Sequence, residues 1–430
     1  MPMKTLGSTI CLSFVTLIFM VAPVHAENQA GLMAGVAKID VTPDKPVTLS
    51  GYAGRKGLST GVHDPLSARV LAFTAAGRRL VLTSIDIIGF YDGTDEYLRS
   101  ALLKEFNLQP SELFLCAIHT HAAPSPTIDR EHGNANNAEY TETLRGKLID
   151  AIRRAIDGMQ PANLGLGVGY CPVGMNRREL RINDKGESSI VLGRNPYGPT
   201  DKAVLVMKVV KSDGAPMAVA FDYATHGTSL GFDNYSISGD VLGLAEQFVE
   251  KILGSNVVVP AFAGASGNID PWYRVLPGFN TEPGWIPEPV LLGTFLGEEV
   301  VHVYRDIKQT GPADMIRTDY VRLQLPAKPG DEVPADKNPG KMPFAVTVAR
   351  LGDVAFVGLG GEVLTEIGMA IKAGSPCEHT FVITHCNGAA GYLSPKELHV
   401  QDGYEIKSSH FAPKAADIVI REVIRMLHDL

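Results

Sequence analysis

Short apolar runs, bounded by glycine, proline and polar residues, recur along the chain and predict β-strands. Apolar residues spaced three and four apart predict amphipathic helices between several of these strands. The expected strands are residues 35–43, 68–74, 79–84, 113–118, 217–223, 257–263, 354–358 and 380–384. The expected helices are residues 96–106, with Thr94 or Asp95 as N-cap, and 138–159, 240–253, 364–372 and 415–427. Strands that alternate with helices indicate an α/β fold, with mixed β-sheets and packed helices.

Three times, a strand ends in polar residues and is followed by a helix and a second strand with a polar end. These ends carry Asp86 with His119/His121, then His226 with Asn268/Asp270, then Glu362 with His385/Tyr392. Ligands of α/β proteins collect at the carboxyl ends of strands, so the three strand–helix–strand units should converge on one site. Polar residues end strands in every α/β protein, but three ends bearing His or Glu favour a shared metal site.

His119 and His121 follow a buried apolar run directly. In an extended chain, residues two apart point to the same side, and imidazole is the commonest protein ligand of zinc-like metals. On its own the pair fits a metal site and a solvated loop about equally well.

The chain has 430 residues, 45% hydrophobic and 20% charged, as in ordinary globular proteins. The net charge is −8 and no run is rich in Lys and Arg, which argues against nucleic acid as a partner. The length permits one large or two medium domains. Because nothing resembles an interdomain linker, we expect one catalytic domain over residues 27–430.

Residues 1–26 are typical of a secretory signal peptide. Lys4 gives a basic start, residues 10–21 an apolar core, and Val24-His25-Ala26 a small-x-small cleavage site. No later stretch is long and apolar enough to cross a membrane. Cleavage after Ala26 would therefore release a protein without a transmembrane segment, secreted or periplasmic.

Beyond the signal peptide lie four cysteines: Cys116, Cys171, Cys377 and Cys386. In an oxidising compartment they allow two disulfides in three pairings, and Cys377 and Cys386 are close enough in sequence to close a small loop. Four buried thiols are the alternative. No Cys-x-x-Cys spacing indicates a cysteine metal site.

Residues 271–289 hold both tryptophans, Trp272 and Trp285, and five prolines, directly after a polar strand end. Such a segment is either an apolar wall or lid over a substrate or a packed surface loop. Residues 326–343 are typical of a solvated loop.

Together, the motifs resemble the neutral (non-lysosomal) ceramidases over nearly the whole mature chain. The motifs are residues 35–43, 51–53 and 81–86, His119-Thr120-His121, Asn176-Arg177, Ala224-Thr225-His226, Gly361-Glu362, Cys386-Asn387 with Tyr392, and Tyr404-Glu405. The resemblance implies a zinc amidohydrolase of the kind that cuts the N-acyl amide of ceramide into fatty acid and sphingosine. It implies one Zn²⁺ per chain, held by His119, His226, Glu362 and Tyr392.

The resemblance also implies roles for the neighbours of the metal ligands. His121 would face the substrate as proton carrier or oxyanion partner. Arg177 stands at the family's substrate-contacting arginine, and Tyr404 at its second site tyrosine. Asp86 is expected to orient a ligand histidine, since metal-bound imidazoles commonly donate to a carboxylate. His385 is left open, and the other histidines are interpreted as structural or surface residues: His63, His132, His302, His379, His399, His410 and His428.

Three departures from the family bear on the substrate. Asp270 stands where the family has the serine on which ceramide cleavage depends; it could act as a general base or bind a polar group of another substrate. Ala389 replaces one aromatic residue of a Tyr-x-x-Tyr segment. We also expect the catalytic part of the family without its C-terminal immunoglobulin-like domain.

The sequence thus predicts a secreted zinc-dependent amidase or esterase that uses a metal-activated water on an N-acyl lipid or similar acylated compound. One alternative is the same zinc site acting on a polar substrate, such as an acylated sugar or amino compound. Another is a non-catalytic metal-containing binding protein, which fits less well because structural zinc usually has a closed Cys and His shell. The acyl chain and the oligomeric state stay open.

Overall fold

The computed structural model describes residues 1–2, 31–254, 256–272, 288–330 and 340–430. The expected signal peptide therefore lies almost wholly outside the described residues, as do most of the aromatic stretch and the centre of the expected solvated loop. Within the described part of the chain, no helix is long and apolar enough to cross a membrane.

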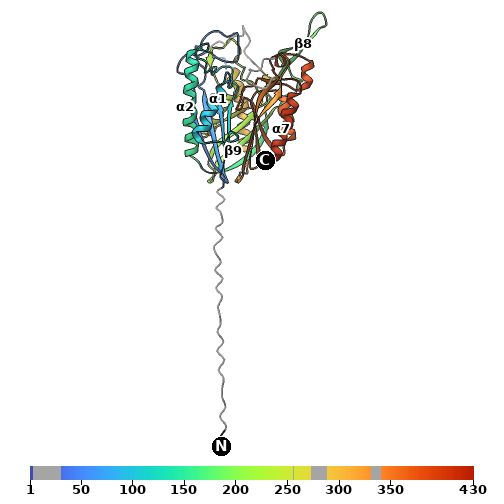
Figure 1. Ribbon diagram of the computed structural model, residues 1–430. Helices are drawn as coiled ribbons and strands as arrows, with labels where there is room; N and C mark the ends of the chain where they lie inside the picture. Colours follow the sequence, from blue (N-terminus) through green and yellow to red (C-terminus); the bar gives the residue numbers. More distant parts are fainter. Residues whose placement is uncertain (3–30, 255, 273–287, 331–339) are drawn as a thin grey trace.

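Two large β-sheets form the body of the protein (Figure 1). The eight-stranded sheet contains, in spatial order, β12 (Ala261–Ala263), β10 (Pro216–Tyr223), β9 (Ala203–Lys211), β6 (Gln160–Tyr170), β1 (Met33–Asp40), β3 (Ser67–Ala75), β4 (Arg78–Ile85) and β5 (Leu113–Ala117). The four-stranded sheet contains β14 (Ile316–Pro326), β15 (Lys341–Leu351), β16 (Val354–Leu359) and β18 (His379–Ile383).

The described residues also form three small sheets. They are β13 (Ile269–Pro271) with β7 (Gly174–Ile182) and β8 (Ser188–Asn195), β11 (Ser236–Ile237) with β2 (Gly61–Val62), and β17 (Glu362–Val363) with β19 (Tyr392–Leu393). The helices are α1 (Thr94–Phe106), α2 (Ala135–Asp157), α3 (Asp240–Leu253), α4 (Glu288–Asp306), α5 (Thr365–Gly374), α6 (Tyr404–Lys407) and α7 (Ala415–Asp429), with 3₁₀ turns η1 (Pro110–Glu112) and η2 (Lys396–Val400).

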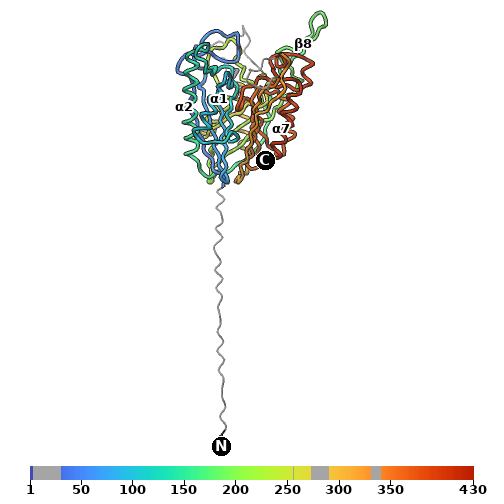
Figure 2. The backbone as a smooth tube through the Cα atoms, viewed as in Figure 1, coloured from blue at the N-terminus to red at the C-terminus, as the bar shows by residue number. Residues whose placement is uncertain are grey.

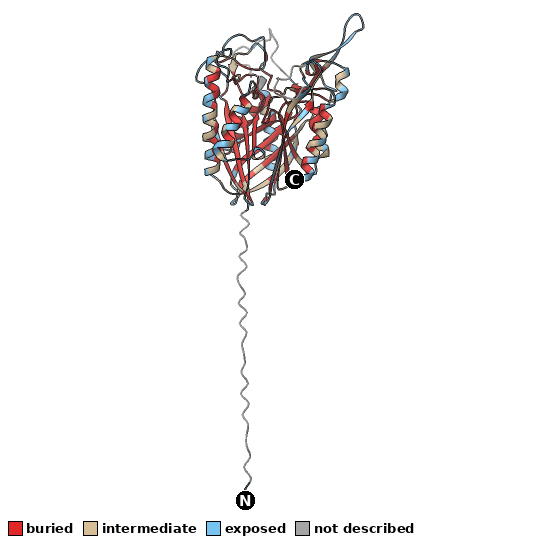
Figure 3. Ribbon diagram, in the orientation of Figure 1, coloured by how far each residue is buried: buried red, intermediate tan, exposed pale blue. Residues whose placement is uncertain are grey.

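The two large sheets share an apolar core, and the helices cover their outer faces. Phe73, Phe114 and Phe262 from the eight-stranded sheet meet Phe356 and Phe381 from the four-stranded one. Separate clusters lie beneath α1 and α2, beneath α3 and α4, and beneath α5 and α7. Figure 3 shows the buried strands between helices whose outer faces are exposed, and Figure 2 shows α2 and α7 on opposite flanks.

The expected strand–helix–strand units are confirmed. β4 pairs with β5, β10 with β12, and β16 with β18, each in parallel and each across a helix, α1, α3 and α5 respectively. Most residues of these strands are buried, including all five of β5. Strands covered on both faces are largely apolar, which explains the apolar runs in the sequence. The α/β fold with mixed sheets is thus confirmed.

Several elements differ from the sequence prediction. The strand expected over 257–263 is regular only over β12, and α1 begins after Gly93 without a side-chain cap, so Thr94 and Asp95 are not N-caps. Neither β6 nor α4 was predicted. β6 is glycine-rich because α4 packs closely on it: a Cβ at Gly169 would lie 2.2 Å from Oε1 of Glu299.

The expected role of Asp86 is wrong. Its carboxylate belongs to a buried network around Arg69, whose guanidinium lies 3.4 Å from Asp86, 2.5 Å from Glu246 and 2.8 Å from Glu250. Burial raises the pKa of Asp86 and that of Glu246. The network ties β3 and the end of β4 to α3, and Asp86 does not orient a histidine.

Asp222 in β10 gives a pH-dependent prediction. Burial raises its pKa from 3.8 to about 6, against the opposing charge of Lys372, 3.3 Å away. Because the folded-state pKa is the higher one, the contribution of Asp222 to stability is complete below about pH 4 and is lost as the pH rises through about 6. The difference corresponds to about 3 kcal/mol at 1.36 kcal/mol per pKa unit.

Between pH 4 and 7, wild type should therefore lose about 3 kcal/mol of unfolding free energy relative to Asp222→Asn. Urea unfolding of both proteins across this range measures it. Asp44→Asn, at an exposed position, is the control. Parallel stability curves for wild type and Asp222→Asn would contradict the raised pKa.

Candidate active site and metal centre

The ends of the three parallel pairs meet because β18 continues between the two edges of the eight-stranded sheet. On one side, the Ala117 N–H at the end of β5 donates to the carbonyl of His385 (3.2 Å). On the other, the Thr384 N–H donates to the carbonyl of Ala263 at the end of β12 (2.9 Å). The third unit thus lies against the first two.

Backbone hydrogen bonds also join the polar ends themselves. The His121 N–H donates to the carbonyl of Gly227 (2.9 Å), which follows His226 directly. The Gly267 N–H donates to the carbonyl of Val363 (2.9 Å), one residue after Glu362. The predicted convergence of the three ends therefore rests on direct pairing of their main chains.

His119, His226 and Glu362 direct their polar atoms to one point. Oε2 of Glu362 lies 3.5 Å from Nε2 of His119 and 3.7 Å from Nε2 of His226. The other ring nitrogen of each histidine contacts a backbone carbonyl: Nδ1 of His119 lies 2.7 Å from that of Ile88, and Nδ1 of His226 lies 2.8 Å from that of Ser266. Both rings are thereby fixed with Nε2 facing Glu362.

These residues fit a metal ion such as zinc. With Nδ1–H donating to a carbonyl, Nε2 of a neutral imidazole carries a lone pair, and a carboxylate oxygen is also an acceptor. Burial and the charge of Arg177 lower the pKa of His226, which favours this neutral form. Acceptor atoms gathered without a hydrogen between them call for a cation, and imidazole nitrogen with carboxylate oxygen is a set that zinc binds.

Two histidines of the site adopt a left-handed backbone. His119 has φ 62° and His385 has φ 51°, and their rings stack with centroids 3.8 Å apart. A left-handed conformation costs a non-glycine residue about 1 kcal/mol or more, and such strain gathers at functional sites. His385, left open from the sequence, thus supports the ring of His119.

His121 lies beside the point where His119 and Glu362 meet. Its Nε2 is 3.3 Å from Nε2 of His119, while its buried Nδ1 has no hydrogen-bond partner in the described part of the chain. A Cβ at Gly51 would lie 2.2 Å from this Nδ1, so the glycine makes room for the ring. Burial and the neighbouring His119 hold the pKa of His121 well below its usual value. Arg55 donates to the backbone carbonyl of His121 (2.9 Å) and fixes the segment.

Arg177 connects the other expected site residues. Its guanidinium donates to Asp270 (3.1 Å), Glu405 (2.9 Å), the hydroxyl of Tyr392 (3.1 Å) and the carbonyl of Gly267 (2.8 Å). All of these contacts are buried. They hold the side chain in one orientation and use most of its donors.

Short strand pairings position Asp270, in β13, and Tyr392, in β19. Register in β17–β19 sets Tyr392 opposite Glu362, and burial raises the pKa of Tyr392 well above its usual value. Burial opposes ionisation of Asp270, but the charge of Arg177 outweighs it and lowers the pKa of Asp270. The ring of Tyr404 lies 5.6 Å from that of Tyr392 and is half exposed, at the rim.

All eight expected site residues therefore lie together: His119, His121, His226, Glu362, Tyr392, Arg177, Asp270 and Tyr404. The ring nitrogens of the three histidines also lie within 4.8 Å of one another. His121 is thus close enough to serve as a third imidazole donor.

Sequence reasoning missed several partners of these residues. The hydroxyl of Tyr91 donates to Glu362 (3.3 Å), and Glu405 accepts from Arg178 (2.8 Å) as well as from Arg177. Arg194 approaches Asp270 at 3.5 Å. The sequence marks two of these residues as candidates, since Tyr91 follows a strand end and Glu405 belongs to a motif. Neither position indicates which residue it contacts.

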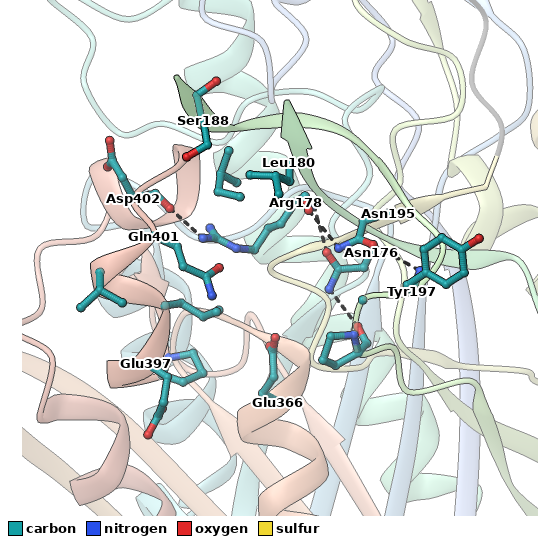
Figure 4. A pocket seen from close by; sticks show the side chains of 17 residues that line it. Asn176, Arg178, Leu180, Ser188, Asn195, Tyr197, Glu366, Glu397, Gln401 and Asp402 are labelled. Carbon is teal, nitrogen blue, oxygen red and sulfur yellow. Dashed lines mark hydrogen bonds between the residues drawn. The ribbon is translucent and has the colours of Figure 1, made fainter. Parts of the chain in front are cut away.

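A cavity of about 1080 Å³ opens on the side of β7 that carries Asn176 and Arg178 (Figure 4). Asn176 and Arg178 line it, whereas Arg177, between them in β7, points to the opposite side, as alternation in a strand requires. None of the eight expected site residues is among those that line it. The cavity and the metal centre are therefore separate features.

The known proteins to which this chain is similar are neutral ceramidases. Residues 32–271 match the family model described as neutral/alkaline non-lysosomal ceramidase, N-terminal. Neutral ceramidase 1 of Arabidopsis thaliana is 23% identical over 262 residues, covering 58% of this chain and 33% of that protein. Neutral ceramidase B of Dictyostelium discoideum is 25% identical over 266 residues, 58% of this chain and 36% of that protein. The chain thus spans about a third of the length of these relatives.

Among solved structures, neutral ceramidase from Pseudomonas aeruginosa has a similar fold. The TM-score is 0.74 at 18% identity, over 92% of this chain and 74% of that one. A ceramidase complexed with C2 gives a TM-score of 0.73 at 17% identity, over 92% and 75% of the two chains.

Proposed function

The chain belongs to the neutral/alkaline non-lysosomal ceramidase family, and on that premise we propose that it is a secreted or periplasmic zinc-dependent hydrolase of an N-acyl amide or acyl ester bond. The observation that carries the proposal is the convergence of His119, His226 and Glu362, with both Nε2 atoms within 3.7 Å of one carboxylate oxygen. His119, His226, Glu362 and Tyr392 would hold the zinc. When bound, zinc would supply Lewis acidity, lowering the pKa of a water and polarising the acyl carbonyl.

His121 would move the proton of the reaction. Burial favours its neutral form, and among the described residues its Nδ1 has no hydrogen-bond partner that would fix one tautomer of the ring. A neutral imidazole accepts a proton at one nitrogen, as a general base, and returns it to the leaving group. The carbonyl-bound Nδ1 atoms of His119 and His226 hold their hydrogens and take no part in this transfer.

The prediction for His121 separates a proton carrier from a metal ligand. His121→Gln should lower kcat by roughly a hundredfold to ten-thousandfold, the usual contribution of a general acid–base, while metal content stays at the wild-type level. Steady-state kinetics and metal analysis of the purified variant measure both. His119→Gln is the matched control, which should lose metal as well. If His121→Gln also loses its metal, His121 is a ligand.

Arg177 would act on the substrate through a positive charge that is held in a fixed position. Its bonds to Asp270, Glu405 and Tyr392 leave it charged and fixed beside His226, from which its Nη1 is 3.4 Å. A positive charge held there stabilises negative charge that develops on the substrate oxygen. Tyr404, half exposed at the rim, and the exposed Trp272 offer aromatic surface to an acyl chain.

Asp270 favours a second candidate, the same reaction on a polar substrate such as an acylated sugar or amino compound. The low pKa of Asp270 keeps it ionised, so it cannot donate a hydrogen bond as a serine hydroxyl does. A carboxylate at this place would accept hydrogen bonds from hydroxyl or amino groups of the substrate.

A panel of acyl substrates separates the two candidates. Purified enzyme is assayed with a ceramide bearing a fluorescent acyl chain, with N-acyl amino acids, with an acylated amino sugar and with water-soluble esters, each with and without a chelator. Chelator-sensitive hydrolysis of ceramide supports the lipid substrate, and preference for the soluble compounds supports the polar one. Asp270→Ser should shift the preference toward ceramide. No chelator-sensitive hydrolysis of any member would contradict the proposed function.

Export is the other part of the proposal, and its support is the sequence of residues 1–26. N-terminal sequencing of protein recovered from the medium or periplasm should begin at Glu27. A chain that keeps its first residues and stays inside the cell would contradict it.

A further inference from the structure

Cys116 and Cys386 face each other across an antiparallel bridge. The flanking hydrogen bonds run from the Ala117 N–H to His385 O (3.2 Å) and from the Asn387 N–H to Leu115 O (3.0 Å). The two cysteines exchange none themselves, which makes them a non-hydrogen-bonded pair. In such pairs the Cα atoms are about 4.5 Å apart, within the range of roughly 4.4–6.8 Å that a disulfide spans.

Both side chains point into the same space. Cys116 and Cys386 belong to the core between the two large sheets, and each is almost completely buried. The thiol of Cys386 lies close enough to that of Cys116 to contribute, after burial, to the raised pKa of the Cys116 thiol. A Cβ at Gly358 would lie 2.5 Å from the sulfur of Cys386, so this glycine leaves room for it.

The segments that carry the two cysteines are held in register independently of any covalent bond. The side chain of Asn387 accepts from the Leu115 N–H (3.0 Å) and donates to the carbonyl of Leu113 (2.7 Å). The cysteines therefore meet without backbone movement. By contrast, strand β18 lies between Cys377 and Cys386, and at about 3.3 Å per residue it keeps them far apart. The small loop considered from the sequence is thus excluded.

We propose that Cys116 and Cys386 form a disulfide when the chain folds in the presence of a disulfide donor. One thiolate attacks the donor R–S–S–R, forming a mixed disulfide and releasing one R–SH. The second cysteine then attacks the mixed disulfide, forming the Cys116–Cys386 bond and releasing a second R–SH. The protein loses two electrons and two protons, and the donor gains them.

The bond forms during folding, before the core closes. In the folded state both sulfurs are buried, and burial raises the pKa of the Cys116 thiol, which leaves little reactive thiolate. The same burial protects the finished bond from reductants. The disulfide would join two segments of the active site permanently: Cys116 lies three residues before His119, and Cys386 follows His385.

The test is a map of the cysteines in full-length protein exported to an oxidising compartment. The protein is alkylated in denaturant without reductant, digested and analysed by mass spectrometry. The peptides of Cys116 and Cys386 should be linked to each other, while Cys171 and Cys377 are alkylated. Alkylation of Cys116 and Cys386 as free thiols, or a bond from either to another cysteine, overturns the proposal.

Thermal unfolding adds a second readout. Wild type in which the bond has been reduced under denaturing conditions and the chain refolded with reductant should melt at least about 5 °C below the oxidised protein. Cys377→Ser should show the same difference between its oxidised and reduced forms, whereas Cys116→Ala should show none. An equal melting temperature for oxidised and reduced wild type would overturn the stabilising role of the bond.

Discussion

Replacing Glu362 with glutamine should lower kcat/KM by roughly three orders of magnitude or more and empty the metal site. The variant keeps the shape of the side chain but removes the negative charge that faces Nε2 of His119 and of His226. Burial opposes ionisation of Glu362, but the neighbouring imidazoles of His119, His226 and His385 hold its pKa well below the usual range, so the wild-type group is a carboxylate. An amide is a far weaker metal ligand, since it carries no net charge.

Glu366→Gln is the matched control for this experiment. Glu366 lies four residues further on, in α5, and its carboxylate accepts hydrogen bonds from Asn268 (3.0 and 3.3 Å). The control should keep its metal and most of its activity. Steady-state kinetics and metal analysis of both variants measure the difference. A Glu362→Gln protein with full metal content and wild-type kcat/KM would show that this carboxylate is not a ligand.

Arg177→Met should cost about 3–5 kcal/mol of unfolding free energy, because it leaves the carboxylates of Asp270 and Glu405 buried without their common partner. Activity should fall as well, by roughly a hundredfold or more, since a fixed positive charge beside the reacting atoms is lost. Denaturant unfolding gives the first quantity and kcat/KM the second.

Arg194→Met serves as the control, since Arg194 approaches Asp270 at 3.5 Å from a partly exposed position. Exposed ion pairs contribute about 0–1 kcal/mol, so its loss should be small. If Arg177→Met is as stable as Arg194→Met, then Arg178, which also binds Glu405, carries the charge balance of this region.

The sequence predicted the part of the site that lies at strand ends. His119, His226 and Glu362 each follow a largely apolar strand, so both the strand and the position of its polar end were visible in the residue pattern. The meeting of the three ends follows from parallel pairing, which short strand–helix–strand units impose. Local pattern and global fold agree at these residues.

What the pattern did not reveal are contacts between residues far apart in the sequence. Asp86 lies at a strand end like the histidines, yet its partners are Arg69 and the α3 residue Glu246, in a network no local spacing indicates. The same holds for the contact of Tyr91 with Glu362. Strand β6 was hidden for another reason: its glycines, which look like loop residues, serve the close approach of α4.

The pairing of the cysteines likewise could not be predicted from the local sequence. Nearness in sequence suggested Cys377 with Cys386, but β18 separates these two. The register that opposes Cys116 and Cys386 arises from residues about 270 positions apart. Such a pairing becomes visible only once the two sheets are packed together.

The metal content of the wild-type chain tests the metal centre at the three strand ends most directly. Elemental mass spectrometry of protein that was purified without chelators should find one zinc per chain. A strong chelator should remove the zinc and the hydrolytic activity together, and added zinc should restore both. A purified chain that carries no stoichiometric metal yet hydrolyses its substrate, or one whose activity survives complete removal of the metal, would contradict the proposed metal centre.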